Sequence, residues 1–109
     1  MKHLFVPYDI ALMAKEKGFD ELCITRWGET SKKLYESWKP LKNSEDGEDF
    51  TSAPLYQQLI DWFKKEHELL IRKTSNGLFW ELIDLQTCTE GPTNPVLDDL
   101  IKEAFKLIK

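Results

Sequence analysis

Two histidines and two cysteines are the side chains of this sequence best suited to nucleophilic or metal chemistry. A thiol activated by an imidazole is a common nucleophile, and the composition allows Cys23 or Cys88 to pair with His67. No local signature surrounds either cysteine, and neither His3 nor His67 has a second ligand at the spacing typical of a metal site. The sequence therefore predicts no catalytic residues, no metal site and no cofactor.

The sequence also contains no motif for a phosphate-binding or a calcium-binding site. The five glycines are scattered over expected turns and form no phosphate-binding loop. The acidic stretch 43–49 (NSEDGED) lacks the alternating carboxylates and terminal glutamate of a calcium loop, so we expect a solvated loop. Asp98 and Asp99 fall on the exposed side of a predicted helix, where they favour solvation. We therefore expect a protein that is not an enzyme.

Aromatic residues need a different explanation, because four tryptophans are many for a chain of 109 residues. Most large rings belong in a core, but the first predicted hairpin and the acidic loop are the parts that packing explains least well. The sequence predicts that these parts contact a partner protein. The candidate contact residues are Trp27, Tyr35, Trp38, Glu45, Asp46, Glu48 and Asp49.

An alternative interpretation is a pocket that sequesters a nucleotide-like small molecule against aromatic rings. Its parts would be Tyr56 and Trp80, with Arg26 or Arg72 as the basic group. A ligand of this kind would stabilise the folded protein and would be detected by a thermal shift. A host accessory protein without a role in defence is a third possibility, and the sequence leaves these alternatives open.

The charge balance restricts the class of partner. The net charge is −4 and the isoelectric point is about 5.2, so direct binding to nucleic-acid phosphates is not expected. An acidic surface suits a basic protein partner, or serves solubility alone. The sequence has no signal peptide and no long apolar run, so we expect a cytoplasmic protein with no membrane association and with buried or half-buried free thiols.

The stretch 52–67 is the predicted centre of the fold. Large apolar residues recur there at helical spacing, and Thr51 or Ser52 precedes them as a candidate helix cap, with Pro54 in the first turn. We expect the following side chains to form the buried stripe: Leu55, Tyr56, Leu59, Ile60, Trp62 and Phe63.

Helices and strands are predicted on both sides of this stretch. A helix from Pro7 to about Lys17 ends at Gly18, and alternating strands follow at 22–27 and 33–38, with Pro40 as the stop. Asn76-Gly77 predicts a two-residue hairpin turn within 69–85, and a helix follows Asn94-Pro95. The hairpin register then pairs Lys73 with Trp80, Arg72 with Glu81 and Ile71 with Leu82.

The predicted fold class is α+β. The order is α-β-β-α-β-β-α, and the simplest arrangement is a mostly antiparallel four-stranded sheet packed by helices. A chain of 109 residues is expected to form a single domain over 1–109. The sequence does not fix the oligomeric state.

Three strings carry a resemblance to a known family. These are KHLFVPYDIAL at 2–12, APLYQQLIDWF at 53–63 and IKEAFKLI at 101–108. Together they resemble a family of small uncharacterised proteins from Bacteroidota and their phages and prophages, from which the region 25–50 departs most. That family has no assigned activity, so no site residues carry over. The resemblance implies a phage-type protein that binds a host protein, such as an anti-CRISPR inhibitor of a CRISPR effector nuclease.

Overall fold

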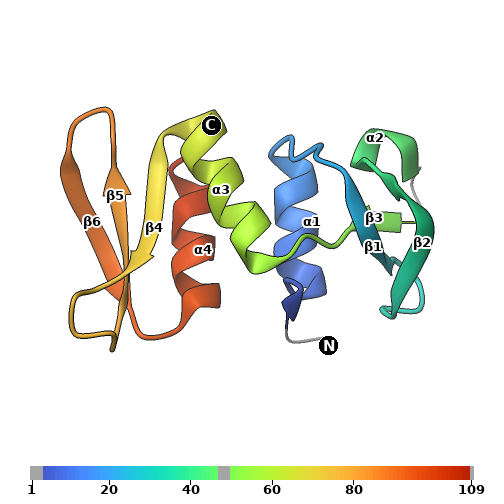
Figure 1. Ribbon diagram of the computed structural model, residues 1–109, viewed down its shortest axis with the longest axis horizontal. Helices are drawn as coiled ribbons and strands as arrows, with labels where there is room; N and C mark the ends of the chain where they lie inside the picture. The colour runs from blue at the N-terminus through green and yellow to red at the C-terminus, as the bar shows by residue number, and fades with distance from the viewer. Residues whose placement is uncertain (1–3, 47–49, 109) are drawn as a thin grey trace. The chain divides into compact units, whose positions relative to one another are not determined.

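The computed structural model describes residues 4–46 and 50–108, without the side chains of residues 37–39 and 46 (Figure 1). The chain divides into two compact units, Met1–Tyr56 and Gln57–Lys109. The expected single domain over 1–109 stays a prediction. Within the described residues, no helix has the length and apolar character needed to cross a membrane.

The first unit is a three-stranded antiparallel sheet with helices on it. Its elements are α1 (Tyr8–Glu16), β1 (Cys23–Gly28), β2 (Leu34–Leu41), α2 (Asn43–Asp46) and β3 (Phe50–Ser52). The strand order is β2-β1-β3, and Phe5 forms an isolated bridge to Leu55. Helix α1 lies beside the sheet (Figure 1).

The end of α1 follows the predicted stop signal. Gly18 has a φ of 93°, a backbone conformation in which a side chain would be strained. The Gly18 N–H donates to the carbonyl of Lys15, and the Phe19 N–H donates to that of Ala14 at 2.9 Å. This pair of bonds satisfies carbonyls that the helix end leaves open. Phe19 then folds back into the core, where it is 1% exposed.

The second unit repeats the motif of helices on a three-stranded antiparallel sheet. Its elements are α3 (Tyr56–His67, which begins at the last residue of the first unit), β4 (Leu69–Lys73), β5 (Trp80–Asp84), β6 (Thr89–Asn94) and α4 (Leu97–Lys106). The strand order is β4-β5-β6. The core of this unit is aromatic: the ring of Phe63 lies 4.9 Å from that of Phe105, and Trp62 contacts both rings.

The buried stripe of α3 is confirmed in its central part. Leu59, Ile60, Trp62 and Phe63 are buried, whereas Leu55 precedes the helix and is 44% exposed. The predicted caps are wrong, because Thr51 and Ser52 belong to β3, where pairing with β1 occupies the backbone.

The register of the second hairpin is also confirmed. Arg72 lies opposite Glu81, as predicted, and their side chains meet at 2.7 Å. The turn differs from the expected two-residue Asn76-Gly77 turn. The Gly77 N–H donates to the Thr74 carbonyl, and Asn76 does not have the positive φ that such a turn requires. A four-residue loop with Gly77 at a φ of 73° therefore keeps the same register.

The α+β class is confirmed, but the strands are grouped differently from the predicted four-stranded sheet. They form two three-stranded sheets, because β3 joins the first predicted hairpin and β6 joins the second. Pro40 lies inside β2 and does not end it. This is possible because β2 is an edge strand, which tolerates a proline whose nitrogen donates no hydrogen bond.

The buried hydroxyl of Thr51 marks a position at which a substitution should stabilise the protein. The Thr51 Oγ1 atom is buried without a hydrogen-bond partner among the described residues, whereas the Thr25 hydroxyl, also buried, donates to the Ala53 carbonyl at 2.9 Å. We expect Thr51→Val to raise the free energy of unfolding by about 1 kcal/mol, because it removes an unsatisfied polar group and keeps the β-branched shape. Thr25→Val is the matched control and should lower it by about 1 kcal/mol. Urea unfolding measures both, and a loss of stability in Thr51→Val would contradict the prediction.

Candidate functional site

The β2-β1-β3 sheet has an inner face against α1 and an outer face away from it. Cys23 and Thr25 are buried on the inner face, whereas Ile24, between them, is 54% exposed. The predicted alternation of this strand is therefore confirmed. Leu22, directly before the strand, is 53% exposed, and Tyr35, opposite Arg26 on the face of Ile24, is 42% exposed. The outer face thus presents several large apolar side chains at its surface.

Tyr35 and Phe50 form a rigid aromatic corner on this outer face. Their rings meet edge to face with centroids 5.9 Å apart, and the Arg26 guanidinium lies 4.9 Å from the centre of the Phe50 ring. The Tyr35 hydroxyl shares a hydrogen bond of 3.0 Å with the Ser31 hydroxyl. A β-carbon at Gly28 would come within 2.9 Å of the Tyr35 ring, so the ring packs on bare backbone. A hollow of about 240 Å³ opens at this corner, lined by Gly28, Glu29, Thr30, Ser31, Tyr35 and Phe50.

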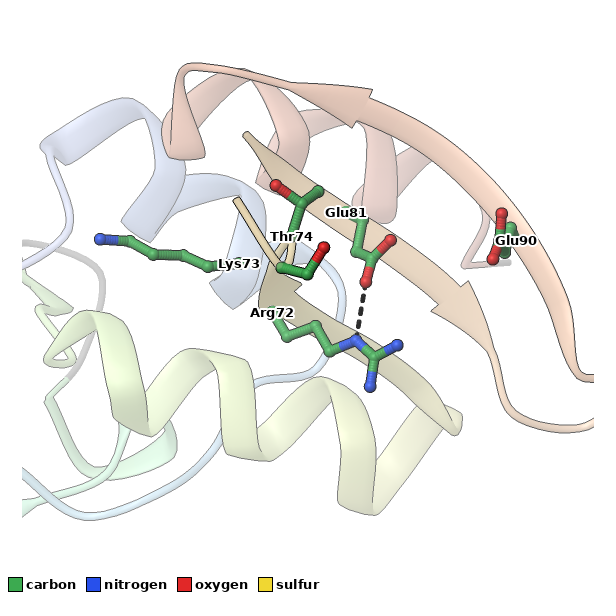
Figure 2. Close-up of a pocket in the computed structure, with 6 residues that line it drawn as sticks. Arg72, Lys73, Thr74, Glu81 and Glu90 are labelled. Carbon is green, nitrogen blue, oxygen red and sulfur yellow. Dashed lines mark hydrogen bonds and ion pairs between the residues drawn. The ribbon is translucent and has the colours of Figure 1, made fainter. Parts of the chain in front are cut away.

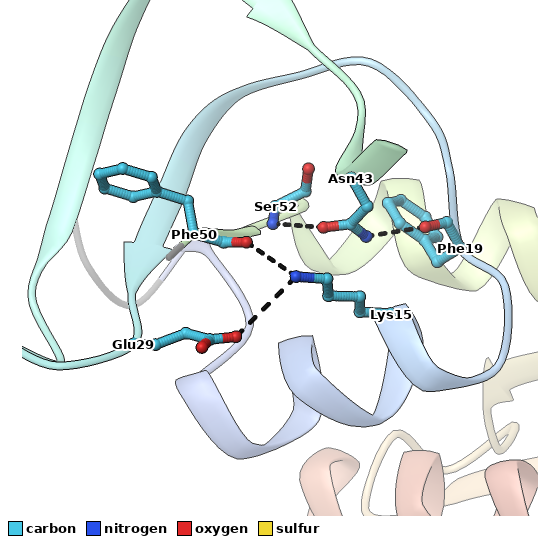
Figure 3. Close-up of polar contacts among 6 residues, drawn as sticks. All are labelled: Lys15, Phe19, Glu29, Asn43, Phe50 and Ser52. Atoms are coloured by element: carbon cyan, nitrogen blue, oxygen red, sulfur yellow. Dashed lines mark hydrogen bonds and ion pairs between the residues drawn. The ribbon is translucent and has the colours of Figure 1, made fainter. Parts of the chain in front are cut away.

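Two polar anchors hold β3 in place behind the corner (Figure 3). The Lys15 ammonium donates to the Phe50 carbonyl at 3.0 Å and lies 3.8 Å from the Glu29 carboxylate. The buried Asn43 amide bridges two segments: it donates to the Phe19 carbonyl and accepts from the Ser52 N–H, each at 2.7 Å. These contacts fix Phe50 relative to α1, so the aromatic corner is pre-organised.

Trp27 lies on the opposite face of the sheet from Tyr35. Its indole N–H donates to the Val6 carbonyl at 3.0 Å, and its ring meets the Tyr8 ring edge to face at 6.5 Å. The half-buried Trp27 thus packs with α1 and the segment before it. The structure therefore does not bring Trp27 and Tyr35 together on one surface of the sheet.

The remaining predicted contact residues lie in or near the acidic segment. Glu45 is exposed, and its carboxylate accepts a hydrogen bond from the Lys42 N–H at 3.0 Å. The other predicted acidic residues and one tryptophan have side chains outside the described residues; they are Trp38 on β2, Asp46 on α2, and Glu48 and Asp49.

The residues of the alternative ligand pocket are divided between the two units. Arg26 and Tyr56 belong to the first unit, and Arg72 and Trp80 to the second. Arg72 lines a hollow of about 490 Å³ together with Lys73, Thr74, Ser75, Glu81 and Glu90 (Figure 2). The Glu81 carboxylate already neutralises the Arg72 guanidinium there, and the lining is polar. The Lys73 ammonium lies 5.4 Å from the centre of the Trp80 ring. The aromatic pocket stays a prediction.

The candidate nucleophile Cys23 and its candidate base His67 belong to different units. Cys23 is buried in the first unit, whereas His67 is half-buried in the second, with its ring 4.7 Å from that of Trp62. Cys88 is exposed in the turn after β5, so the expectation of two buried or half-buried thiols is wrong for it. Within residues 4–46 and 50–108, no three His, Cys, Asp or Glu side chains cluster as metal ligands do.

Comparisons with protein-family models, curated proteins and solved structures gave no match for this chain. The outer-face residues were therefore identified from geometry alone. The alternation predicted for 22–27 puts Leu22, Ile24 and Arg26 on one side of a strand, but it does not show which side α1 covers. No sequence pattern predicts a role for Phe50, although its ring completes the aromatic corner.

Proposed function

We propose that this protein acts without catalysis, by binding another protein through the outer face of its β2-β1-β3 sheet. The observation that carries the proposal is the exposure of Ile24 and Tyr35 on one sheet face, beside the fixed ring of Phe50 and near the exposed Leu22 that precedes β1. Exposed apolar side chains gathered on one face are typical of interaction surfaces, and rigid aromatic side chains supply much of their binding energy.

The side chains of the outer face indicate what kind of partner it would bind. Apolar and aromatic side chains favour a partner with an apolar patch, and Arg26 adds a basic group beside the Phe50 ring. The net charge of −4 favours a partner of opposite charge and speeds its approach. The resemblance of the sequence to phage and prophage proteins directs the first search to host defence proteins, including CRISPR effector nucleases.

Binding is tested by capture from host lysate with three forms of the protein. The double variant Ile24→Ser and Tyr35→Ser removes outer-face contacts, whereas Leu78→Ser removes a 68% exposed leucine of the second unit as a matched control. We expect the wild type and the control to capture the same partner, and the double variant to bind it at least about tenfold more weakly. Equal capture by all three forms, or no partner for the wild type, would contradict the proposed surface.

The defence role needs its own assay. Cells that carry a CRISPR effector are challenged with phage while they express the wild type, the double variant or Leu78→Ser. We expect the wild type and Leu78→Ser to abolish immunity and the double variant to leave it intact. Unchanged immunity with the wild type would reject inhibition of that effector, while the capture experiment would still decide whether the protein binds another protein.

A further inference from the structure

Strand β2 has one paired edge and one open edge. It lies at the side of the β2-β1-β3 order, so only its inner edge meets β1. The Gly28 N–H donates to the Lys33 carbonyl at 3.0 Å, which makes these two residues a hydrogen-bonded pair. Such pairs alternate with non-hydrogen-bonded pairs along antiparallel strands. Arg26 and Tyr35, two residues further along each strand, are therefore also a hydrogen-bonded pair.

The same alternation turns the main chain of Leu34 and Glu36 away from β1. A contact on the neighbouring strand agrees with this assignment. Thr25, the residue opposite Glu36, directs its carbonyl to the other side, where it accepts from the Ala53 N–H at 3.0 Å. Across the described ranges 4–46 and 50–108, no strand pairs with the open edge of β2. The N–H and C=O groups of Leu34 and Glu36 thus form a template for another strand.

The regular part of this edge is short and centred near Tyr35. On one side it starts after a turn in which Lys32 has a φ of 56°. On the other side the register with β1 shifts between Thr25 and Cys23, and Cys23 lies opposite Leu41. This irregularity limits pairing beyond Glu36, because a bulge interrupts a ladder.

We propose that the occupant of this edge is β2 of a second copy of the chain, aligned antiparallel about a two-fold axis through Tyr35. Leu34 of each copy then exchanges main-chain hydrogen bonds with Glu36 of the other. The two Tyr35 residues, each 42% exposed, lie opposite one another on the joined outer face, while each ring stays packed on Gly28 and Phe50 of its own copy. The result is one continuous sheet across both copies, formed through an isologous interface.

Charge selects this antiparallel alignment. A basic residue, Lys33, stands directly before the regular stretch and an acidic residue, Glu36, stands at its other end, and both side chains are exposed. Lys32 lies in the preceding turn, with its ammonium 3.9 Å from the centre of the Tyr8 ring. An antiparallel second copy brings the basic end of each strand beside the acidic end of the other, whereas a parallel copy would align like charges. The pairing uses main-chain groups, so it is independent of the side-chain contacts in the proposed function.

The oligomeric state of the full chain tests this inference. Light scattering coupled to gel filtration, over about 5–500 µM, should give a molar mass that rises to that of a dimer. Glu36→Pro removes an N–H that points away from β1 and should weaken the dimer at least about tenfold. Glu36→Thr keeps that N–H and is the matched control, which should still dimerise. Near-UV circular dichroism of the tryptophans verifies that each variant is folded.

Amide hydrogen exchange provides a test that needs no substitution. If the second copy pairs at β2, the amides of Leu34 and Glu36 should exchange at least about tenfold more slowly at 500 µM than at 5 µM. The Arg26 amide, which is bonded within the unit, should change little. A monomer throughout the range overturns the proposal, as does a dimer whose Leu34 and Glu36 amides remain as fast as in the monomer. Capture of a foreign strand at this edge by a monomeric protein would also overturn it.

Discussion

Phe105→Ala should destabilise the protein more than any other single change considered, by about 3–5 kcal/mol in the free energy of unfolding. Phe105 is 1% exposed, and its ring lies 4.9 Å from Phe63 and 6.5 Å from Trp62. Truncation therefore leaves a cavity between α3 and α4 and removes two ring contacts. Urea unfolding, followed by tryptophan fluorescence, measures the effect because Trp62 borders that cavity.

Phe79→Ala is the matched control for this experiment. Phe79 is 40% exposed in the same unit, so its truncation should lower the free energy of unfolding by less than about 1 kcal/mol. Similar losses for the two variants would contradict an aromatic core centred on Phe105. The unfolding curve also tests the expected single domain over 1–109. One transition that shifts as a whole agrees with a single domain, whereas a shift in only one of two transitions would show that the units unfold separately.

Local signals in the sequence were sufficient for much of this fold. Gly18 could be assigned as a helix stop because few other residues adopt its φ of 93°. The Arg72–Glu81 register could be predicted because opposite charges and a glycine-containing turn agree on it. In both cases the deciding interaction lies within about ten residues of chain.

Strand β6 could not be predicted, because its sequence TEGPTN contains glycine and proline and few strand formers. Its pairing with β5 makes it a strand, and a β-carbon at Gly91 would approach the Leu82 carbonyl to 3.0 Å. The outer-face site could not be predicted from the sequence for a similar reason. The exposure of Ile24 and Tyr35 depends on which face α1 covers, and this is a contact between segments distant in sequence.

Asn43→Ala should lower the free energy of unfolding by about 2–4 kcal/mol. The Asn43 side chain is buried and makes two hydrogen bonds of 2.7 Å, to the Phe19 carbonyl and from the Ser52 N–H. Alanine leaves both groups without these partners in the interior, and an unsatisfied buried group costs more than a hydrogen bond contributes. Because Ser52 belongs to β3, the same variant should loosen Phe50 and weaken partner capture by the outer face.

Asn43→Asp separates the two hydrogen bonds. The introduced carboxylate still accepts a hydrogen bond from the Ser52 N–H, but it cannot donate one to the Phe19 carbonyl. Its negative charge instead faces the negative end of that carbonyl dipole. Burial and that carbonyl should raise the pKa of the introduced carboxyl in the folded protein above its value in the unfolded chain. The stability of this variant should therefore be highest below the unfolded pKa and fall as the pH rises through the folded pKa.

Urea unfolding of Asn43→Asp and the wild type between about pH 3 and pH 8 measures this difference in stability, since the carboxyl titrates in this range. The protonated carboxyl can donate to the Phe19 carbonyl as the amide does, so the variant should approach the wild type most closely at the acidic end. If the difference in the free energy of unfolding between the variant and the wild type does not vary with pH, the hydrogen bond to the Phe19 carbonyl contributes little to stability. The contribution of Asn43 would then come from its hydrogen bond with the Ser52 N–H.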